Sequence, residues 1–483
     1  MPHAPKPRGF RPLSSSLFGP YDLRFAGLTL PHIKPLGLPI ISAAVRQSSQ
    51  WCHYYESAVM RRMRLGISLE VPEDLTPEQH IEHMRDLPPE SLPHHDYTPL
   101  PDSLREAIKV AALGVHDPVL LRDNRERVMT AVRRANELLQ PLRREWTQKL
   151  PPCCKQLNLP LMALLAHICQ YPDKAFVDQL RRHGGVPFVG HLTAGGALFA
   201  PVERKERPTI SLTELAKRSS KRLSWFTTHP PSSSQREHWA TLWDMALSEV
   251  SQGRLEGPFS LDYLSSLSEP PGVTLRHLVV TSTKQRPVDD YRRSHINAAT
   301  SVGHKVTLPE VSTILSAMRE LWLTLPPASI AQADSGIEGL RIYKLDHRDA
   351  YRQVPILDEH RLLSTVLLWN DTTASYHGFY HRVCPFGAIS SVTGYLRLSS
   401  LLTHVCRTLL GIPLISYLDD FIGIDWASTA LDSFTYVKEL NALLGLDLKT
   451  EKEIQPTTQA TILGVNFDLS DPTHEQVLGK MLV

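Results

Sequence analysis

The chain has 483 residues, of which 42% are hydrophobic and 21% charged, a composition typical of folded proteins and a length sufficient for two or three domains. Its net charge of +2 excludes a polycation, so any contact with nucleic acid would depend on local basic patches. Six cysteines without a Cys-x-x-Cys pair argue against a disulfide scaffold or a zinc site, and they favour an intracellular setting, cytoplasm or nucleus.

No targeting or membrane segment is recognisable in the sequence. The basic, proline-rich start lacks the apolar stretch of a secretory signal. The longest apolar run, which begins at Leu159, is too short to cross a bilayer. No membrane partner is therefore expected, and the oligomeric state stays open.

The first half of the chain reads as a poorly defined segment followed by helices. Residues 1–100 are rich in proline and follow no clear pattern. Residues 101–235 are predicted to form a mostly helical region, with helices over 102–150 and about 158–183, because apolar residues recur there at helical spacing. The remainder, 185–235, is predicted to be rich in loops.

A basic run next to aromatic residues lies in this loop-rich part. It contains Lys217, Arg218, Lys221 and Arg222, close to Trp225. Cationic side chains next to an aromatic ring can contact phosphates and stack a base, so the run is a candidate nucleic-acid contact. The alternative is an ordinary solvated basic segment.

Residues 236–483 alternate between strand-like and helical patterns and predict an α+β domain. One predicted strand ends at Asp346. A long predicted helix follows the sequence CPFGAISSV and stops at Gly411, a residue suited to a helix C-terminus. A strand, a tight turn and a second strand then contain Asp419 and Asp420. Asp-Asp is a poor choice for a two-residue turn, which indicates a functional reason for the pair.

The three acids Asp346, Asp419 and Asp420 form a candidate metal site. One carboxylate from a strand end and two from a neighbouring hairpin turn can hold two Mg²⁺ ions, with Mn²⁺ as an alternative, roughly 3.5–4 Å apart. Such a pair supports phosphoryl transfer. On composition alone the alternative, solvated turn acids and an unrelated strand acid, is favoured, because Asp-Asp pairs are common.

Five segments, taken in order, resemble the motifs of reverse transcriptases. They are KQRPVDDYRRSHIN, LDHRDAYRQVPI, CPFGAISSV, YLDD and TEKEIQPTTQATILGVNFDL. Each segment alone is a weak signal, but their common order is specific. They lie between about residues 284 and 469, so the resemblance covers under half of the chain. Their wording is most similar to retrotransposons of protists and algae.

The resemblance implies a catalytic set of residues. Asp346 and Asp419 would be the direct metal ligands, with Asp420 as a third, weaker one. Lys452, or alternatively Lys449, would protonate the departing pyrophosphate.

The resemblance also implies a nucleotide site. Lys284 and Arg286 would bind the incoming triphosphate. The ring of Tyr351 would exclude a ribose 2′-hydroxyl, with a buried core tyrosine as the alternative. Phe386 and Gly387 would shape the nucleotide pocket.

Two further features concern the end of the chain. Leu463 and Gly464 would lie at the primer grip. The chain stops at Val483, which by the resemblance leaves no room for a helical thumb. A fragment of a polyprotein, a truncated copy and a domesticated remnant all stay open.

The resemblance thus implies an α+β polymerase palm-and-fingers domain over 236–483, without a thumb and preceded by the mostly helical region. The implied activity is RNA-directed DNA polymerisation in a retrotransposon, with an RNA or DNA template, a primer and deoxynucleoside triphosphates. The rival is an inactive or domesticated nucleic-acid-binding or structural protein derived from such an enzyme. An RNA-dependent RNA polymerase is a third possibility, which Tyr351 opposes.

Overall fold

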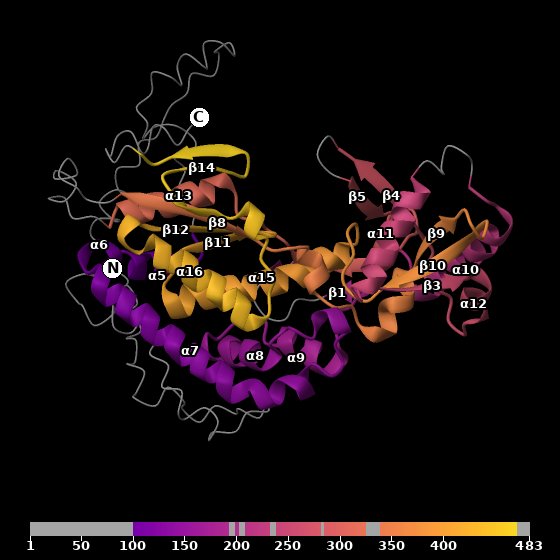
Figure 1. Cartoon of the computed structure of the whole chain (residues 1–483), viewed down its shortest axis with the longest axis horizontal. Coiled ribbons are helices and arrows are strands. Elements are labelled where there is room, and N and C mark those ends of the chain that lie inside the picture. The colour runs from indigo at the N-terminus through magenta and orange to yellow at the C-terminus, as the bar shows by residue number, and fades with distance from the viewer. Residues whose placement is uncertain are drawn as a thin grey trace, which may run out of the picture.

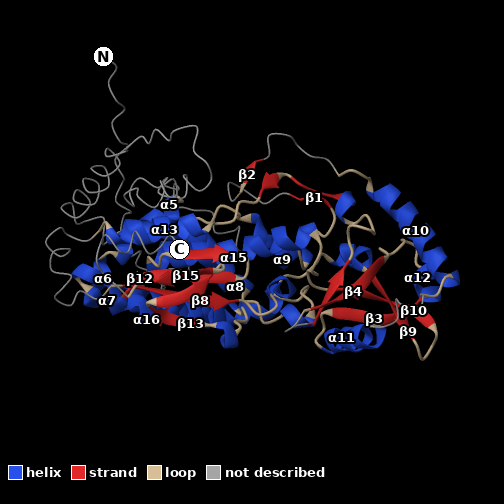
Figure 2. Cartoon of the chain, turned by 90° about the horizontal axis from the view of Figure 1, so that it is seen from above, coloured by secondary structure: helices blue, strands red, loops and turns tan. Residues whose placement is uncertain are grey.

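A computed structural model describes residues 100–192, 199–201, 208–231, 238–281, 285–324 and 339–470. The predicted proline-rich region and Lys284 lie outside these ranges, apart from Leu100. The described residues combine helices and sheets in an α+β fold. The two larger sheets lie toward opposite ends of the molecule (Figure 2). None of the helices in these ranges has both the length and the apolar character needed to span a membrane.

Helices form the first part of the described chain, as predicted for 102–150 and 158–183. They are α5 (Asp102–Ala111), α6 (Leu113–His116), α7 (Pro118–Trp146), α8 (Leu159–Ile168) and α9 (Ala175–His183). Helix α7 begins where the Asp117 carboxylate accepts a hydrogen bond of 2.9 Å from the Leu120 N–H. Helix α9 ends at Gly184, whose φ of 77° needs a residue without a Cβ.

The central sheet is the second-half element that carries the candidate acids. Its strands are β11 (Leu414–Tyr417), β12 (Asp420–Trp426), β8 (Leu340–Asp346) and β13 (Ile454–Thr457), in that spatial order, and all pairs are antiparallel. The predicted long helix is α15 (Ile389–Leu410), and it stops at Gly411 as expected. Helix α16 (Ala427–Leu444) follows β12 directly.

Two hydrophobic cores cover the two faces of the central sheet. On one face Tyr343, Leu345 and Phe421 pack in one core with α7, α15 and α16. On the other face Ile342 and Ile422 pack with α5, with α13 (Val311–Trp322) and with the hairpin of β14 (Gln459–Ile462) and β15 (Val465–Asp468). Figure 1 shows α13 and β14 on one side of the strands, with α15 and α16 on the other.

A lateral sheet of five strands forms the other end of the molecule (Figure 1). Its spatial order is β3 (Leu255–Ser260), β10 (Ser375–His381), β9 (Val366–Asn370), β4 (Thr274–Val280) and β5 (Gln285–Asp289). A third core beside it includes residues of α10 (Leu212–Thr228), α11 (Trp239–Ser251) and α12 (Leu261–Ser266).

Short elements connect these layers. Strand β1 (Gly190–Leu192) pairs with β6 (Thr300–Val302), and β2 (Ala200–Pro201) pairs with β7 (His304–Lys305). Short 3₁₀ helices cover Pro152–Cys154, Asn297–Ala299, Ala350–Gln353, Asp358–Ser364 and Thr450–Lys452.

The prediction of a loop-rich segment over 185–235 was wrong for α10, which spans 17 residues. The Ser211 hydroxyl caps its start by accepting a hydrogen bond from the Glu214 N–H. Leu215, Leu223 and Phe226 are buried on one side of the helix. Burial of this apolar side stabilises the helix. The many Ser and basic residues of its sequence weaken the local helical pattern, which is why the sequence did not predict it.

The predicted boundary at residue 235 does not separate two cores. Buried Arg125 of α7 forms an ion pair of 2.9 Å with buried Asp425 of β12, and it donates to the carbonyls of Leu410 and Gly411. Arg397 of α15 likewise pairs with buried Asp173. Because these charges lie inside the protein, they compensate each other only when the N-terminal helices are docked on the central sheet.

Candidate active site

The register of the central sheet brings the candidate acids together. Asp346 ends β8 and Asp420 begins β12, and the antiparallel pairing places these two residues directly opposite each other. Side chains of directly opposed residues project from the same face of a sheet. The strand-end acid and the hairpin acid are therefore neighbours, although they are far apart in the sequence.

The hairpin turn consists of Leu418 and Asp419, since Tyr417 pairs with Asp420. Leu418 has a φ of 50°, which is uncommon for a residue with a branched side chain. The His347 N–H donates a hydrogen bond of 3.0 Å to the Asp419 carbonyl and so ties the turn to the end of β8. Backbone strain held in this way is a feature of functional turns.

Each of the two opposed acids contacts a lysine. Lys452 Nζ lies 2.6 Å from Asp346 Oδ2, and the Asp346 side chain is only 2% exposed. Lys344 Nζ lies 3.0 Å from Asp420 Oδ1. Lys449 instead contributes its backbone N–H, which donates to the Asp346 carbonyl. Of the two predicted lysines, Lys452 is thus the one whose side chain reaches the acids.

The electrostatics show that the three acids act on a common region. The hydrogen bond from Asp346 raises the pKa of Lys452, and the negative charges of Asp346, Asp419 and Asp420 all add to this rise. Burial raises the pKa of Asp420, and the charges of Asp419 and Asp346 do so as well, while Lys344 opposes the change. One ammonium group therefore senses all three carboxylates.

As the side chains lie, no three Asp, Glu, His or Cys residues of the described ranges are grouped closely enough to hold a metal ion. Asp346 and Asp420 are turned toward lysines instead. Carboxylate oxygens are nevertheless the donors that Mg²⁺ prefers, and the Lys452 ammonium marks a position where a cation is stabilised. By donor type the three carboxylates match a hard divalent cation, while in this arrangement the ammonium groups of Lys452 and Lys344 occupy Asp346 and Asp420.

Tyr351 lies in a group of aromatic rings beside the acids. Its ring centroid is 5.2 Å from that of Phe386 and 5.6 Å from that of Tyr395, and the rings meet edge to face. Burial raises the pKa of Tyr351, and the charge of Asp419 adds to the rise. Tyr351 is half-buried.

Gly387 lies where the backbone of two segments meets. Its φ is 95°, and a Cβ there would lie 2.5 Å from the Asp289 carbonyl oxygen, so only glycine fits. The Asn297 side chain donates to the Gly387 carbonyl at 3.0 Å and accepts from the Ile389 N–H at 3.1 Å. The hydrogen bonds of Asn297 thus join the start of α15 to the 3₁₀ helix Asn297–Ala299, while Gly387 itself packs on the end of β5.

Two predicted groups lie apart from the acids as far as the described contacts show. Arg286 is exposed on β5, where it is paired with Val279 of β4, and no described contact joins it to the acids. Leu463 and Gly464 form the turn of the β14–β15 hairpin, with φ values of 51° and 81°. That hairpin packs on the same face of the central sheet as Ile342 and Ile422, and its primer-grip role stays a prediction.

Residues without a sequence-based prediction complete the site. Tyr395 donates its hydroxyl to His347 Nδ1 at 2.9 Å, and His347 Nε2 donates to Asn441 Oδ1 at 2.7 Å. Burial lowers the pKa of His347 to about 4, so the ring is neutral at pH 7 and can play both roles. Lys344 could have been recognised, because it stands two residues before Asp346 on the same strand face. The hydrogen bonds of His347 join three segments that are far apart in the sequence, so no local sequence pattern could have predicted them.

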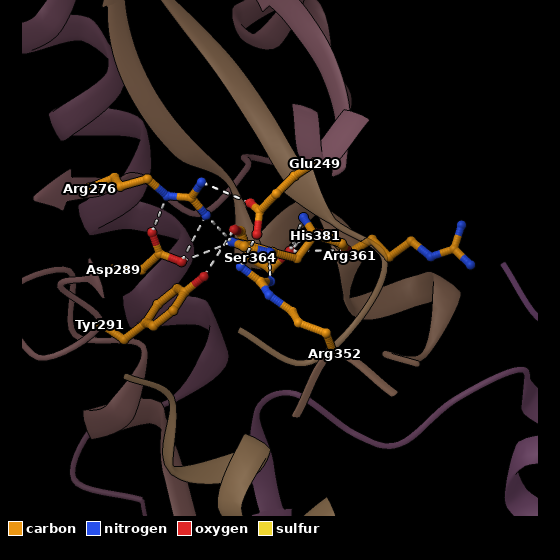
Figure 3. Close-up of polar contacts among 8 residues, drawn as sticks. All are labelled: Glu249, Arg276, Asp289, Tyr291, Arg352, Arg361, Ser364 and His381. Atoms are coloured by element: carbon orange, nitrogen blue, oxygen red, sulfur yellow. Dashed lines mark hydrogen bonds and ion pairs between the residues drawn. The ribbon is translucent and has the colours of Figure 1, made fainter. Parts of the chain in front are cut away.

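A buried polar network includes Arg352, the residue after Tyr351, and side chains of the lateral sheet (Figure 3). Arg352 donates to Glu249 at 2.6 Å and to His381 Nδ1 at 2.7 Å. Arg276 donates to Asp289 at 2.7 Å and to Glu249 at 2.9 Å. Two arginines and two carboxylates balance each other, so the network is neutral when His381 is neutral.

The tautomer of His381 follows from its partners. Because Arg352 donates to Nδ1, the ring proton sits on Nε2 and points to Asp289 Oδ2, 2.9 Å away. A second proton on Nδ1 would face the Arg352 guanidinium. Burial first, and then the charge of Arg352, lower the pKa of His381 to about 4.

This shift predicts a pH dependence of stability. His381 has a lower pKa in the folded chain than its ordinary value of 6.5, so the unfolded chain binds more protons between about pH 4 and 6.5. Stability is therefore full above that window and is lost as the pH falls through it. His381→Gln, which can still accept from Arg352 and donate to Asp289, should flatten the dependence by up to about 1.4 kcal/mol per pH unit in urea unfolding.

The matched control for this experiment is His183→Gln, at an exposed position near the end of α9. Its dependence on pH should stay close to that of the unmodified chain. An identical slope for His381→Gln and the unmodified chain would show that His381 does not titrate on unfolding.

Comparisons with known proteins find similarity only to solved structures. No model of a protein family matches the chain, and no curated protein matches it. Among solved structures, the chain is similar to the foamy viral protease-reverse transcriptase dRH in complex with double-stranded DNA, at 14% identity and a TM-score of 0.35. The match covers 47% of this chain and 33% of that one.

Proposed function

We propose that the chain is an RNA-directed DNA polymerase that transfers nucleotides to a primer 3′-hydroxyl. The observation that supports this most is the convergence of Asp346, Asp419 and Asp420 at one edge of the central sheet, where all three act on Lys452. In this proposal the central sheet with α15 and α16 is the palm, and the lateral sheet with α10, α11 and α12 is the fingers. The retrotransposon origin stays a prediction from the wording of the motifs.

Asp346, Asp419 and Asp420 would hold the metal ions. Bound there, two Mg²⁺ ions, or Mn²⁺, would activate the attacking hydroxyl and stabilise the departing oxygen of a deoxynucleoside triphosphate. The strained turn at Leu418 keeps two acids at the rim of the sheet, next to the strand-end acid. Lys452, rather than Lys449, would protonate the departing pyrophosphate, because its side chain is the one at the acids.

The remaining residues would bind and select the nucleotide. Arg286, together with Lys284, would bind the triphosphate, since a guanidinium matches phosphate oxygens with two parallel hydrogen bonds. Phe386 and Gly387 would line the base and sugar. Tyr351, held against Phe386 and Tyr395, would occupy the volume of a 2′-hydroxyl.

Primer extension by the full chain tests this function. A labelled primer annealed to an RNA or a DNA template should be extended with deoxynucleoside triphosphates and Mg²⁺ or Mn²⁺. Absence of extension on both templates with both cations would contradict the proposal. Tight binding of the primer-template without extension would instead support the inactive, nucleic-acid-binding alternative, for which the lysines on Asp346 and Asp420 are the favouring observation.

The second measurement concerns sugar choice. Tyr351→Ala or Tyr351→Val should raise incorporation of ribonucleotides relative to deoxynucleotides by roughly tenfold or more, because steric exclusion acts on the 2′-hydroxyl alone. The ratio is measured by extension with each nucleotide in separate reactions. Tyr351→Phe is the control and should keep the ratio, since the ring and not its hydroxyl would fill the space. An unaltered ratio in Tyr351→Ala would make Tyr351 a packing residue.

A further inference from the structure

A cavity lies on the lateral end of the molecule, among α10, α11 and β4. Its volume is about 460 Å³, within the range of small-ligand sites. Arg276 is the one lining residue used below that also belongs to the network of Figure 3, and none of the candidate acids or the aromatic residues beside them lines the pocket. We call it the lateral pocket, and the lining residues used below are Arg222, Trp225, Trp239, Arg276, Arg293 and Tyr376.

The lateral pocket offers a half-exposed aromatic surface. Trp225 is 51% exposed, although tryptophan side chains are usually well covered. His229 stacks almost parallel on its ring, with centroids 4.4 Å apart and an angle of 9°. Phe226 and Tyr376 meet edge to face at 4.9 Å and form an apolar wall. An exposed ring that is fixed in this way is suited to stacking a flat ligand.

The same pocket holds two arginines, Arg222 and Arg293, that form no ion pair in the described part of the chain, although the Asp290 carboxylate lies near and accepts from the Arg293 backbone N–H. Arg222 donates to the Arg293 carbonyl at 2.5 Å, so the two side chains come from adjoining segments. Within the described ranges no ion pair joins either of them to Asp or Glu. Burial lowers the pKa of Arg222, and the charge of Arg293 lowers it further, while Asp290 opposes this. Two like charges in one cavity would be stabilised by an anion.

Two further polar side chains of the pocket, Arg276 and Trp239, indicate which groups could contact a ligand. Arg276 is already engaged by Asp289 and Glu249, so it does not add a free cation. Trp239 is 6% exposed, and its indole N–H has no acceptor among the described residues. An acceptor from a ligand would satisfy that donor.

We propose that the lateral pocket binds one nucleotide of a single-stranded nucleic acid, with its base stacked on Trp225 and its phosphate on Arg222 and Arg293. The exposed ring matches a base face, and the paired guanidinium groups match a phosphate. Helix α10 continues the basic surface with exposed Lys217 and Lys221. Arg218, by contrast, is paired with Glu214 at 2.8 Å and is not a free cation of this surface. The site is separate from the proposed polymerase site.

Binding of single strands by the full chain tests the lateral pocket. The probe is a fluorescent single-stranded RNA of about a dozen nucleotides, measured by anisotropy in EDTA over a series of salt concentrations. Trp225→Leu should weaken binding about tenfold, because stacking on an aromatic ring contributes about 1–3 kcal/mol per base. Arg293→Gln should weaken binding and reduce the slope of log affinity against log salt by about 0.7, the value for one phosphate contact.

The matched controls remove an aromatic ring and an arginine charge at positions outside the lateral pocket. Tyr263→Leu removes an exposed aromatic ring on α12, and Arg127→Gln removes an exposed charge on α7. Both should bind the RNA as the unmodified chain does. The proposal is overturned if Trp225→Leu and Arg293→Gln bind within twofold of the unmodified chain with an unchanged salt slope. It is also overturned if an acidic peptide binds the pocket in a Trp225-dependent way and the RNA does not.

This test is independent of catalysis. Binding in EDTA requires neither a metal ion nor a primer terminus. A chain that extends no primer but loses RNA affinity on Trp225→Leu would contradict the polymerase proposal and support the lateral pocket. A chain that extends primers but binds single strands equally well with and without Trp225 would give the reverse result.

Discussion

Asp346→Asn should abolish primer extension, with a loss of about a thousandfold or more. Asparagine keeps the shape of the side chain but removes the charge that holds a divalent cation, and a metal ion contributes several kcal/mol to phosphoryl transfer, at about 1.4 kcal/mol for each tenfold in rate. Asp346 is the strand-end acid opposite Asp420, so its loss should disturb metal binding by the opposed pair of acids. The measurement is a single-turnover extension assay with saturating deoxynucleotide.

The variant should still fold. Its partner Lys452 is 36% exposed and can turn to solvent when the carboxylate is replaced, so no charge is trapped. Asp447→Asn is the matched control, because it makes the same change at an exposed acid next to the site and should keep full activity. If Asp346→Asn extends primers within tenfold of the unmodified chain while folding normally, Asp346 is not a metal ligand and the proposed function loses its main support.

The second large effect is expected on stability. Asp289→Asn should lower the free energy of unfolding by about 3–5 kcal/mol, because it leaves buried Arg276 without its closest counter-charge. Arg276 and Asp289 are 1% and 2% exposed, so water cannot replace the lost partner. Urea unfolding followed by circular dichroism gives the change, provided that the unfolding slope stays the same.

Two further variants test whether the expected loss comes from leaving a buried charge unpaired or from any loss of an ion pair. Glu256→Gln breaks the half-exposed pair with Arg382 and should cost about 0–1 kcal/mol. The double variant Arg276→Met with Asp289→Leu removes both charges and should recover much of the loss, because no unpaired charge remains. A cost for Asp289→Asn no larger than that for Glu256→Gln would show that the network of Figure 3 contributes little to stability.

Local patterns in the sequence were sufficient to predict several elements. The helices over 102–150, the stop of α15 at Gly411 and the strand ending at Asp346 all follow from spacing and capping signals within a few residues. The hairpin containing Asp419 was also predicted, since strand and turn signals are local, but the prediction of Asp419 and Asp420 as its turn was wrong: the turn is Leu418 and Asp419, and Asp420 pairs with Tyr417 as the first residue of β12. The α+β class follows from the same patterns. The roles of the site residues were implied by a resemblance and stay predictions.

Only the tertiary structure decided which residues meet. The sequence does not show that β12 inserts between β11 and β8, and that pairing is what sets Asp346 opposite Asp420. It also left Lys452 and Lys449 open, a choice that depends on which side chain points to the sheet. The helix α10 was missed because burial of its apolar side, against residues distant in the chain, outweighs the weak helical signal of its sequence.

The N-terminal helices show the same division most clearly. The existence of these helices follows from the local spacing of apolar residues, because backbone hydrogen bonds in a helix join residues four apart. Their docking is not, because buried Arg125 is stabilised by Asp425, which lies 300 residues later in the chain. Local periodicity thus determines most of the N-terminal helices, α15 and the strand of Asp346, whereas burial and charge pairing between distant segments determine helix α10, the candidate active site, the buried network and the lateral pocket.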